Sequence, residues 1–282
     1  MRHTQPDSRK QALKDAIKVL VGKESAARRE LTVRPDDVFI TSYPKSGNTW
    51  TRFLLANLLW PEGDTDFVNI EKRVPDIYKQ TDRALLACDR PRYLKSHEYF
   101  DPRYPKILYI VRDPRSVLVS YYNYEMRWAT CFNAKTTYYD FAKVFLDGKL
   151  GTFVFGNWQQ NVSSWLGVYG QKSERLCCIK YEDLLYNGPK TLSKVVDFIG
   201  LERSQQQLEQ ALDRSSLERM KALEKASAQQ GKQWEKSARN KDIPFVRAGK
   251  SKEWCDVLDY KTLALIEERY GRLMVQLGYD IS

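Results

Sequence analysis

Cysteine is scarce in this sequence, and its five cysteines include no C-x-x-C pair. An odd number without that spacing argues against a zinc site and against a framework of disulfide bonds, and it favours a reducing compartment. The five are Cys88, Cys131, Cys177, Cys178 and Cys255.

Long hydrophobic runs are also missing. The chain begins with the polar stretch MRHTQPDSRK, and no later run approaches the ~20 apolar residues of a membrane-spanning helix. We therefore expect no membrane span, and a soluble protein of the cytoplasm.

No internal repeat or long linker divides the chain, and 42% hydrophobic residues in 282 can form one substantial core. Apolar, β-rich runs alternate with amphipathic helical patterns, which is typical of a single α/β domain with a parallel sheet. We expect a leader over residues 1–34 with a short helix near 11–21, and the domain over 35–282. Strands are predicted over 38–41, 93–96, 106–113 and 175–183, and helices over 47–59, 115–124, 138–146, 157–169, 189–199, 205–212 and 260–277.

Acidic residues are outnumbered, since 46 lysines and arginines face 36 acids and give a net charge of +10. This excess favours an acidic partner such as nucleic acid, an anionic membrane or a phosphate-rich small molecule, although a plain basic surface accounts for it equally well. The segment 225–252 holds eight of the basic residues and two acids. We interpret it as a mobile lid or basic loop.

The stretch FITSYPKSGNTW (39–50) predicts an anion site. A strand that turns into a helix presents backbone N–H groups at the helix N-terminus, where the macrodipole favours negative charge. Gly47 permits close approach of the backbone, and Lys45 adds a point charge. The loop of ATPases places its lysine after the last glycine, whereas here Lys45 precedes Gly47, and no acidic strand end for Mg²⁺ follows. An ordinary strand–turn–helix corner would not require the lysine.

A second anion site is predicted in YIVRDPRSVLVSYY (109–122). Arg112 ends a strand of the buried type, at the edge where open α/β sheets bind ligands. Pro114 begins a helix, and Ser120 lies eight residues beyond Arg112, about two helical turns on. Two such sites imply a ligand with two separate phosphates. On the alternative interpretation, Arg112 only forms an ion pair with Asp113 or another carboxylate.

Together, TSYPKSGNTW and YIVRDPRSVLVSYY resemble the cytosolic sulfotransferases, which use 3′-phosphoadenosine 5′-phosphosulfate (PAPS). The resemblance extends over about residues 35–280, with dense matches only in short segments. It implies a P-loop-like α/β domain with a central parallel sheet of about five strands flanked by helices. It also implies PAPS as cofactor, adenosine 3′,5′-bisphosphate as product, and no metal.

The family's K-x-H segment is matched by YLKSHEY, which contains Lys95 and His97. The only other histidine, His3, lies in a polar tail, so the resemblance makes His97 the general base, with Glu98 as the alternative. A neutral imidazole can remove the proton of an acceptor hydroxyl. Lys45 would neutralise charge on the leaving oxygen, and Lys95 would bind the sulfuryl oxygens.

The resemblance also maps a nucleotide site. The phosphate loop would hold the 5′-phosphosulfate, Trp50 would stack on adenine with Tyr181 nearby, and Arg112 with Ser120 would hold the 3′-phosphate. The segment SSLERM (215–220) aligns with a family T-S-F segment, with leucine in place of the phenylalanine. The cofactor residues expected are Lys45, Ser46, Gly47, Asn48, Thr49, Trp50, Arg112, Ser120, Tyr181, Ser215, Leu217, Arg247, Ala248 and Gly249. Each aromatic residue also fits an ordinary core role.

Near the end, FVRAGKSKEW (245–254) resembles the family's R-K-G-x-x-G-D-W. Arg247 and Gly249 match and would close over the 3′-phosphate, whereas Ala248 stands where the family has lysine. Lys250 and Lys252 are candidates to supply the lost charge. The stretch CDVLDYKTLALIE does not match the family's dimer motif, which leaves the oligomeric state open.

The acceptor is expected to be a small phenol or alcohol bound beside His97. Candidate walls follow an R-V-P triplet, and further walls are expected from 121–132 and 225–246. Two other functions fit parts of the sequence: an ATP-dependent small-molecule or nucleoside kinase, and a nucleic-acid-binding protein, although no nucleic-acid motif is present. The candidate walls of the acceptor pocket at this triplet and just after it are Val74, Pro75, Ile77 and Tyr78.

Overall fold

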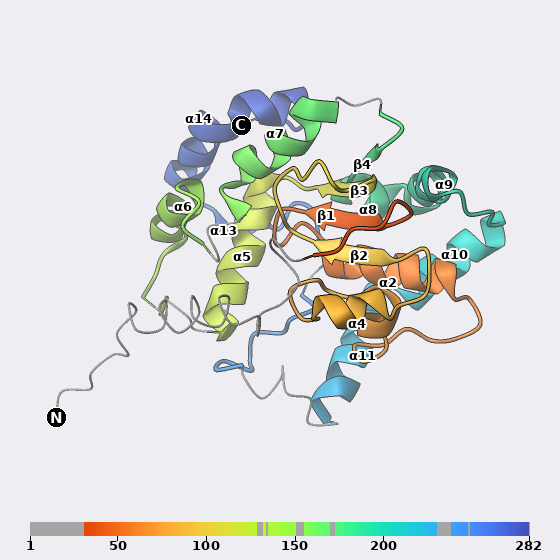
Figure 1. Cartoon of the computed structure of the whole chain (residues 1–282). Helices are drawn as coiled ribbons and strands as arrows, with labels where there is room; N and C mark the ends of the chain where they lie inside the picture. The colour runs from red at the N-terminus through yellow and green to blue at the C-terminus, as the bar shows by residue number, and fades with distance from the viewer. Residues whose placement is uncertain are drawn as a thin grey trace.

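The computed structural model describes residues 31–128, 132–133, 135–150, 155–169, 173–229, 238–247 and 249–281. Within these ranges the chain forms one parallel sheet with the strand order β2-β1-β3-β4 (Figure 1). The strands are β1 (Val38–Ser42), β2 (Tyr93–Ser96), β3 (Lys106–Val111) and β4 (Leu176–Lys180). The α/β class is therefore confirmed, with four strands in the described residues where about five were expected.

Helices lie on both faces of this sheet (Figure 1). They are α2 (Asn48–Leu59), α3 (Ile70–Arg73), α4 (Asp82–Leu86), α5 (Pro114–Trp128), α6 (Tyr138–Leu146), α7 (Trp158–Tyr169), α8 (Tyr181–Tyr186), α9 (Gly188–Ile199), α10 (Gln205–Arg214), α11 (Leu217–Gln229), α13 (Trp254–Val257) and α14 (Tyr260–Gln276). No described helix is long and apolar enough to cross a membrane.

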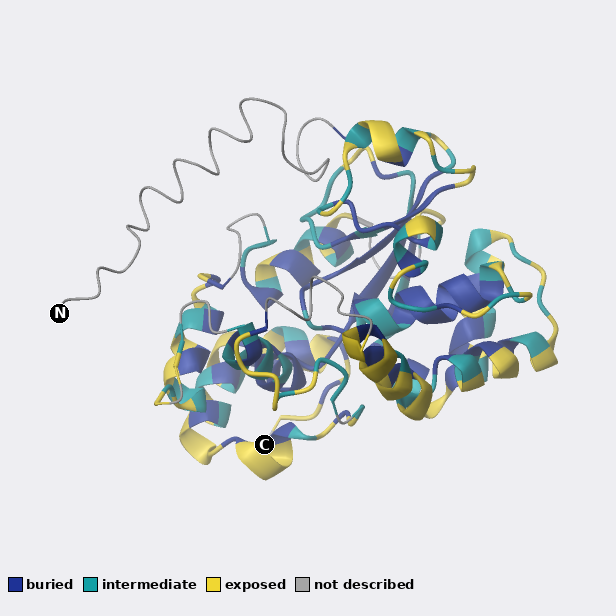
Figure 2. Ribbon diagram, turned by 90° about the horizontal axis from the view of Figure 1, so that it is seen from below, coloured by how far each residue is buried: buried dark blue, intermediate teal, exposed yellow. Residues whose placement is uncertain are grey.

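The sheet separates two hydrophobic clusters because successive strand residues point to opposite faces. Phe39 and Tyr109 pack into one cluster with residues of α5, α6, α7 and α14. Ile40 and Leu108 pack into the other with residues of α2, α9, α10 and α11. The strands are accordingly buried between helices whose outer faces are exposed (Figure 2). Burial on both faces explains the continuous apolar runs of the sequence.

Most predicted elements lie within a few residues of the observed ones, and three need correction. The strand predicted over 175–183 ends at Lys180, since Tyr181 begins α8. The strand predicted over 106–113 ends at Val111, so Arg112 lies just beyond it. The first residues of the predicted loop 225–252 belong to α11, which ends at Gln229. The helix predicted near 11–21 lies outside the described residues.

The parallel register places three loop starts side by side. Thr41 of β1 is paired with Ser96 of β2, and Ser42 is paired with Ile110 of β3. The residues that follow these strands therefore emerge at the same edge of the sheet. That edge carries the predicted phosphate loop, His97 and Arg112.

Candidate functional site

The predicted phosphate loop connects β1 to α2 through two residues in the left-handed backbone region. Lys45 has φ 67° and Gly47 has φ 94°. A Cβ added to Gly47 would lie 2.4 Å from Cδ2 of Tyr181, so the aromatic ring occupies the space that a side chain would need. Asn48 secures the loop, since its Nδ2 donates to Ile40 O at 3.1 Å and to Ser42 Oγ at 3.2 Å. Glycine is required here by both conformation and space.

Lys45 extends from this loop to two aromatic rings. Its Nζ lies 4.2 Å from the ring centroid of Tyr124 and 5.1 Å from that of Phe245. Burial, together with the positive charges of Arg247 and Arg112, lowers the pKa of Lys45 to about 7. Its charge is thus poorly compensated by the protein, and a bound anion would stabilise it.

His97 follows β2 directly and is held by contacts with Ser42, Tyr78 and Asn161. Its Nδ1 lies 2.8 Å from Ser42 O. A carbonyl oxygen can only accept, so Nδ1 carries the proton and Nε2 is left as the acceptor when the ring is neutral. Its backbone N–H donates to Tyr78 Oη at 2.8 Å, Asn161 Nδ2 donates to its carbonyl at 3.0 Å, and the rings of Tyr78 and His97 are parallel within 15°.

The electrostatic surroundings keep this imidazole neutral. Burial and the positive charge of Lys95 lower the pKa of His97 well below its ordinary 6.5. At neutral pH the ring can therefore accept a proton at Nε2, as a general base must.

Lys95 is held by an acidic partner that the sequence did not single out. Its Nζ lies 2.8 Å from Asp76 Oδ2, and both side chains are largely buried. Asp76 Oδ1 also accepts from the backbone N–H of Tyr78 at 3.0 Å. The ion pair thereby connects Lys95 to the segment that positions His97. The only indication of this partner in the sequence was that Asp76 directly follows the R-V-P triplet.

Arg112 connects the predicted second anion site to the predicted phosphate loop. Its Nη1 donates to Lys45 O and its Nη2 to Lys250 O, each at 3.2 Å, and its guanidinium lies 4.2 Å from the ring centroid of Tyr181. Its buried Nε has no hydrogen-bond partner among the described residues. The expected alternative, an ion pair with Asp113, does not form, because Asp113 pairs with Arg115 at 2.8 Å.

The predicted adenine residues also gather around Tyr181. The rings of Trp50 and Tyr181 meet edge to face at 5.5 Å, and Trp50 Nε1 donates to Ser215 O at 2.8 Å. Ser215 Oγ accepts from Asn57 Nδ2 at 2.9 Å, which fixes a side chain with no exposed surface. Leu217, the first residue of α11, lies against Gly249, whose added Cβ would be 3.3 Å from its Cδ2.

The segment after Phe245 crosses α5 near Ser120. Arg247 Nη1 donates to the carbonyl of Val119, the neighbour of Ser120, at 3.1 Å, and Arg247 also pairs with Glu253. Gly249 has φ 61°. Ala248 lies outside the described residues.

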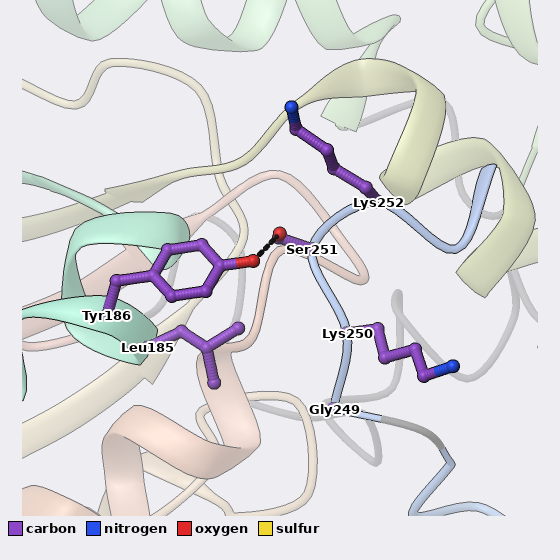
Figure 3. A pocket seen from close by; sticks show the side chains of 6 residues that line it. All are labelled: Leu185, Tyr186, Gly249, Lys250, Ser251 and Lys252. Atoms are coloured by element: carbon purple, nitrogen blue, oxygen red, sulfur yellow. Dashed lines mark hydrogen bonds between the residues drawn. The ribbon is translucent and has the colours of Figure 1, made fainter. Parts of the chain in front are cut away.

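A cavity of about 430 Å³ lies beside this segment, between α8 and residues 249–252. The hydroxyls of Tyr186 and Ser251 point toward each other across it and form a hydrogen bond (Figure 3). The ammonium groups of Lys250 and Lys252 point away from that pair (Figure 3).

The four predicted acceptor walls lie in different environments. Val74 and Ile77 have no exposed surface and pack into the two core clusters, and Pro75 is buried beside them. Tyr78 is the member that contacts His97. Phe155, which the sequence did not indicate, meets both rings edge to face, at 5.3 Å from Tyr78 and 5.6 Å from His97.

Comparison with known proteins decides the family. Residues 35–278 match the family model described as "Sulfotransferase domain". The chain belongs to the sulfotransferase family. Among curated relatives, this chain is 28% identical over 199 residues to Sulfotransferase 1E1 of Bos taurus, an alignment that covers 65% of each chain. It is 30% identical over 204 residues to Sulfotransferase 2A1 of Mus musculus, covering 66% of each. The chain thus spans less than two thirds of the length of either relative.

Solved structures share the fold of this chain. Mouse sulfotransferase SULT7A1, complexed with PAP, superposes with a TM-score of 0.65 at 20% identity, over 88% of this chain and 90% of its own. Retinol dehydratase, in complex with androsterone and the inactive cofactor PAP, gives a TM-score of 0.72 at 20% identity, over 94% and 85%.

Proposed function

We propose that this protein transfers the sulfuryl group of PAPS to a hydroxyl of a small-molecule acceptor by in-line displacement, with His97 as general base. The observation that carries the proposal is the position of His97. Its Nδ1 forms a hydrogen bond with Ser42 O, at the end of the strand that leads into the phosphate loop. The lone pair of Nε2 is thereby available beside an anion-binding loop.

The residues present fit a nucleotide with two phosphates. The buried Arg112 Nε and Ser46 Oγ have no partners among the described residues, and Trp50 and Tyr181 supply aromatic surfaces. PAPS, when bound, would supply an activated sulfuryl group. We assign Lys45 through Thr49 to its 5′-phosphosulfate and Arg112, Ser120 and Arg247 to its 3′-phosphate. The PAP complexes of the structural neighbours support this cofactor.

The side chains would divide the chemistry by charge. His97 would take the acceptor proton at Nε2, which its low pKa leaves free at neutral pH. The positive charge of Lys45 would stabilise the negative charge that grows on the oxygen of the leaving phosphate. Lys95, held by its ion pair with Asp76, would bind the sulfuryl oxygens. We assign the acceptor to the aromatic walls around Tyr78, as a phenol or an alcohol.

Ligand binding tests the cofactor. Adenosine 3′,5′-bisphosphate should raise the melting temperature of the protein, because a ligand that binds only the folded state stabilises it. ATP with Mg²⁺ and a DNA duplex serve as comparisons. A larger shift with ATP–Mg²⁺ would favour the hypothesis of an ATP-dependent kinase. A shift with DNA alone would favour the hypothesis of a nucleic-acid-binding protein.

Turnover tests the base. With labelled PAPS and a panel of phenols and alcohols, His97→Ala should lower kcat by about 10²- to 10⁴-fold, the usual contribution of general base catalysis. Its affinity for the bisphosphate should stay unchanged, which controls for folding. Wild-type turnover in this variant would remove His97 from the mechanism.

A further inference from the structure

The ammonium of Lys45 lies between two rings that come from distant parts of the chain. Tyr124 belongs to α5, and Phe245 lies in a segment that precedes α13. The distances of 4.2 Å and 5.1 Å from Nζ to the two centroids are within the range of cation–π attraction. Among the described residues, no carboxylate forms an ion pair with this ammonium.

Phe245 is carried by a strap, defined here as residues 238–247, that two side chains fasten to the domain. Both carboxylate oxygens of Glu224 on α11 accept backbone N–H groups, from Phe245 at 2.7 Å and Val246 at 2.8 Å. Arg127 on α5 donates to Ile243 O, and its own carbonyl accepts from the N–H of Asn240 at 3.0 Å. The ring of Phe245 is therefore brought to Lys45 by a segment attached at both ends.

The charges that act most on Lys45 come from four parts of the chain. Arg112 beyond β3, Arg247 on the strap and Lys95 on β2 lower its pKa by repulsion, while Glu125 on α5 raises it. The positive charge of Lys45 in turn contributes to the lowered pKa of the His97 imidazole. Burial is the largest influence, and it acts in the direction of the neutral amine.

We propose that Tyr124 and Phe245 are positioning residues that hold the Lys45 ammonium beside the phosphate loop and keep water away from it. Rings attract a cation without neutralising it. The charge of Lys45 is therefore available to an anion that binds to the loop. This inference rests on the proposed function in one respect, namely that the anion is the 5′-phosphate end of the donor.

Proton uptake follows from this arrangement. The free protein has Lys45 partly neutral at pH 7, since its pKa is about 7. A bound phosphate raises that pKa, so binding at a higher pH requires a proton. The affinity for adenosine 3′,5′-bisphosphate should therefore fall by up to about tenfold for each pH unit between roughly pH 7.5 and 9. His97 titrates below this window and does not contribute.

The free protein gives the first test, which needs no donor. Trace acetylation followed by peptide mass spectrometry measures the neutral fraction of each lysine against pH. We expect Lys45 to titrate near 7 in the wild type. Phe245→Ala should admit water and raise the pKa of Lys45 toward the ordinary 10.5. Phe245→Tyr keeps a ring at this position and should leave the pKa of Lys45 near its wild-type value.

A matched control exists elsewhere in the chain. The Nζ of Lys106 lies 5.3 Å from the ring centroid of Phe198, which resembles the distance between Lys45 and Phe245. Phe198→Ala should leave the titration of Lys45 at its wild-type position. A wild-type Lys45 that titrates near 10, or a Phe245→Ala protein that titrates like the wild type, would overturn the proposal.

The second test measures the bisphosphate Kd of each variant against pH. Phe245→Ala should lose the steep dependence between about pH 7.5 and 9, because Lys45 is already charged there, and Phe245→Tyr should keep it. An unchanged slope in Phe245→Ala would contradict the proposal. If the wild type does not bind the bisphosphate at all, the proposed function fails, and the acetylation titration alone decides the role of the two rings.

Discussion

At the scale of a single residue, Gly47 shows how one missing side chain shapes the site. Its φ of 94° is strained for any other residue, and the ring of Tyr181 lies where its Cβ would be. The same ring contacts Trp50 and the guanidinium of Arg112. A side chain at position 47 would therefore displace the group that connects the two predicted phosphate sites.

Gly47→Ala should weaken bisphosphate binding by roughly tenfold or more, equivalent to about 1.4 kcal/mol. It should also cost about 1 kcal/mol of folding free energy through its left-handed backbone. Calorimetric titration and urea unfolding measure the two effects. Gly167→Ala is the matched control, because Gly167 lies in α7 and an added Cβ there meets nothing within 4 Å. Equal affinities in both variants would contradict the role given to Tyr181.

At the scale of an element, the beginnings of β1 and β2 are joined by a buried ion pair. Arg92 donates to both carboxylate oxygens of Asp37, at 2.8 Å and 2.6 Å, and neither side chain has exposed surface. Arg92 also donates to Thr32 O at 2.7 Å, and its carbonyl accepts from Val38 N at 2.8 Å. The pair sets the register of the two strands that end at the phosphate loop and at His97.

Asp37→Ala should lower the free energy of unfolding by about 3–5 kcal/mol, since it leaves the Arg92 charge buried without its partner. Urea denaturation with a constant m-value measures the loss. The neighbouring residue offers the control: Asp36 forms a similar pair with Arg90, but that pair is exposed. Asp36→Ala should change the unfolding midpoint little. A small effect at both positions would show that the buried pair does not stabilise the strands.

At the scale of the whole molecule, the C-terminal part of the chain returns to the predicted second phosphate site. Arg115, at the start of α5, pairs with Asp113 and with Glu267 of α14, each at 2.8 Å, and donates to Asp280 O at 2.7 Å. Its guanidinium also lies 3.8 Å from the ring centroid of Trp254. One side chain thus holds the end of the chain against the strand end that carries Arg112.

Arg115→Leu should destabilise the protein by about 3–5 kcal/mol, because two largely buried carboxylates lose their shared cation. The bisphosphate affinity should fall as well, since Arg112 and Asp113 are adjacent in the chain. Thermal unfolding and calorimetric titration measure these changes. Lys149→Leu removes an exposed ion pair with Asp147 and should leave both quantities near their wild-type values. Wild-type stability in Arg115→Leu would show that the C-terminal segment is held by other contacts.

Much of the fold could be predicted from local features of the sequence. The periodicity of 138–146 predicted α6 at its observed bounds, and the stretch YLKS at 93–96 predicted the short strand β2. The order of Lys45 and Gly47 predicted a phosphate loop of a particular type, and the K-x-H spacing singled out His97. These signals lie within a few residues of one another, so no tertiary contact is needed to interpret them.

Only the tertiary structure decided which distant groups meet. No spacing in the sequence indicates that Tyr181 fills the space above Gly47, that Asp76 pairs with Lys95, or that Phe245 reaches Lys45. The sequence likewise left open an ion pair between Arg112 and Asp113, which the pairing of Asp113 with Arg115 excludes. Residue types and local periodicity determine the elements and the reactive groups. Packing across the sheet determines their neighbours, and with them their charge and protonation.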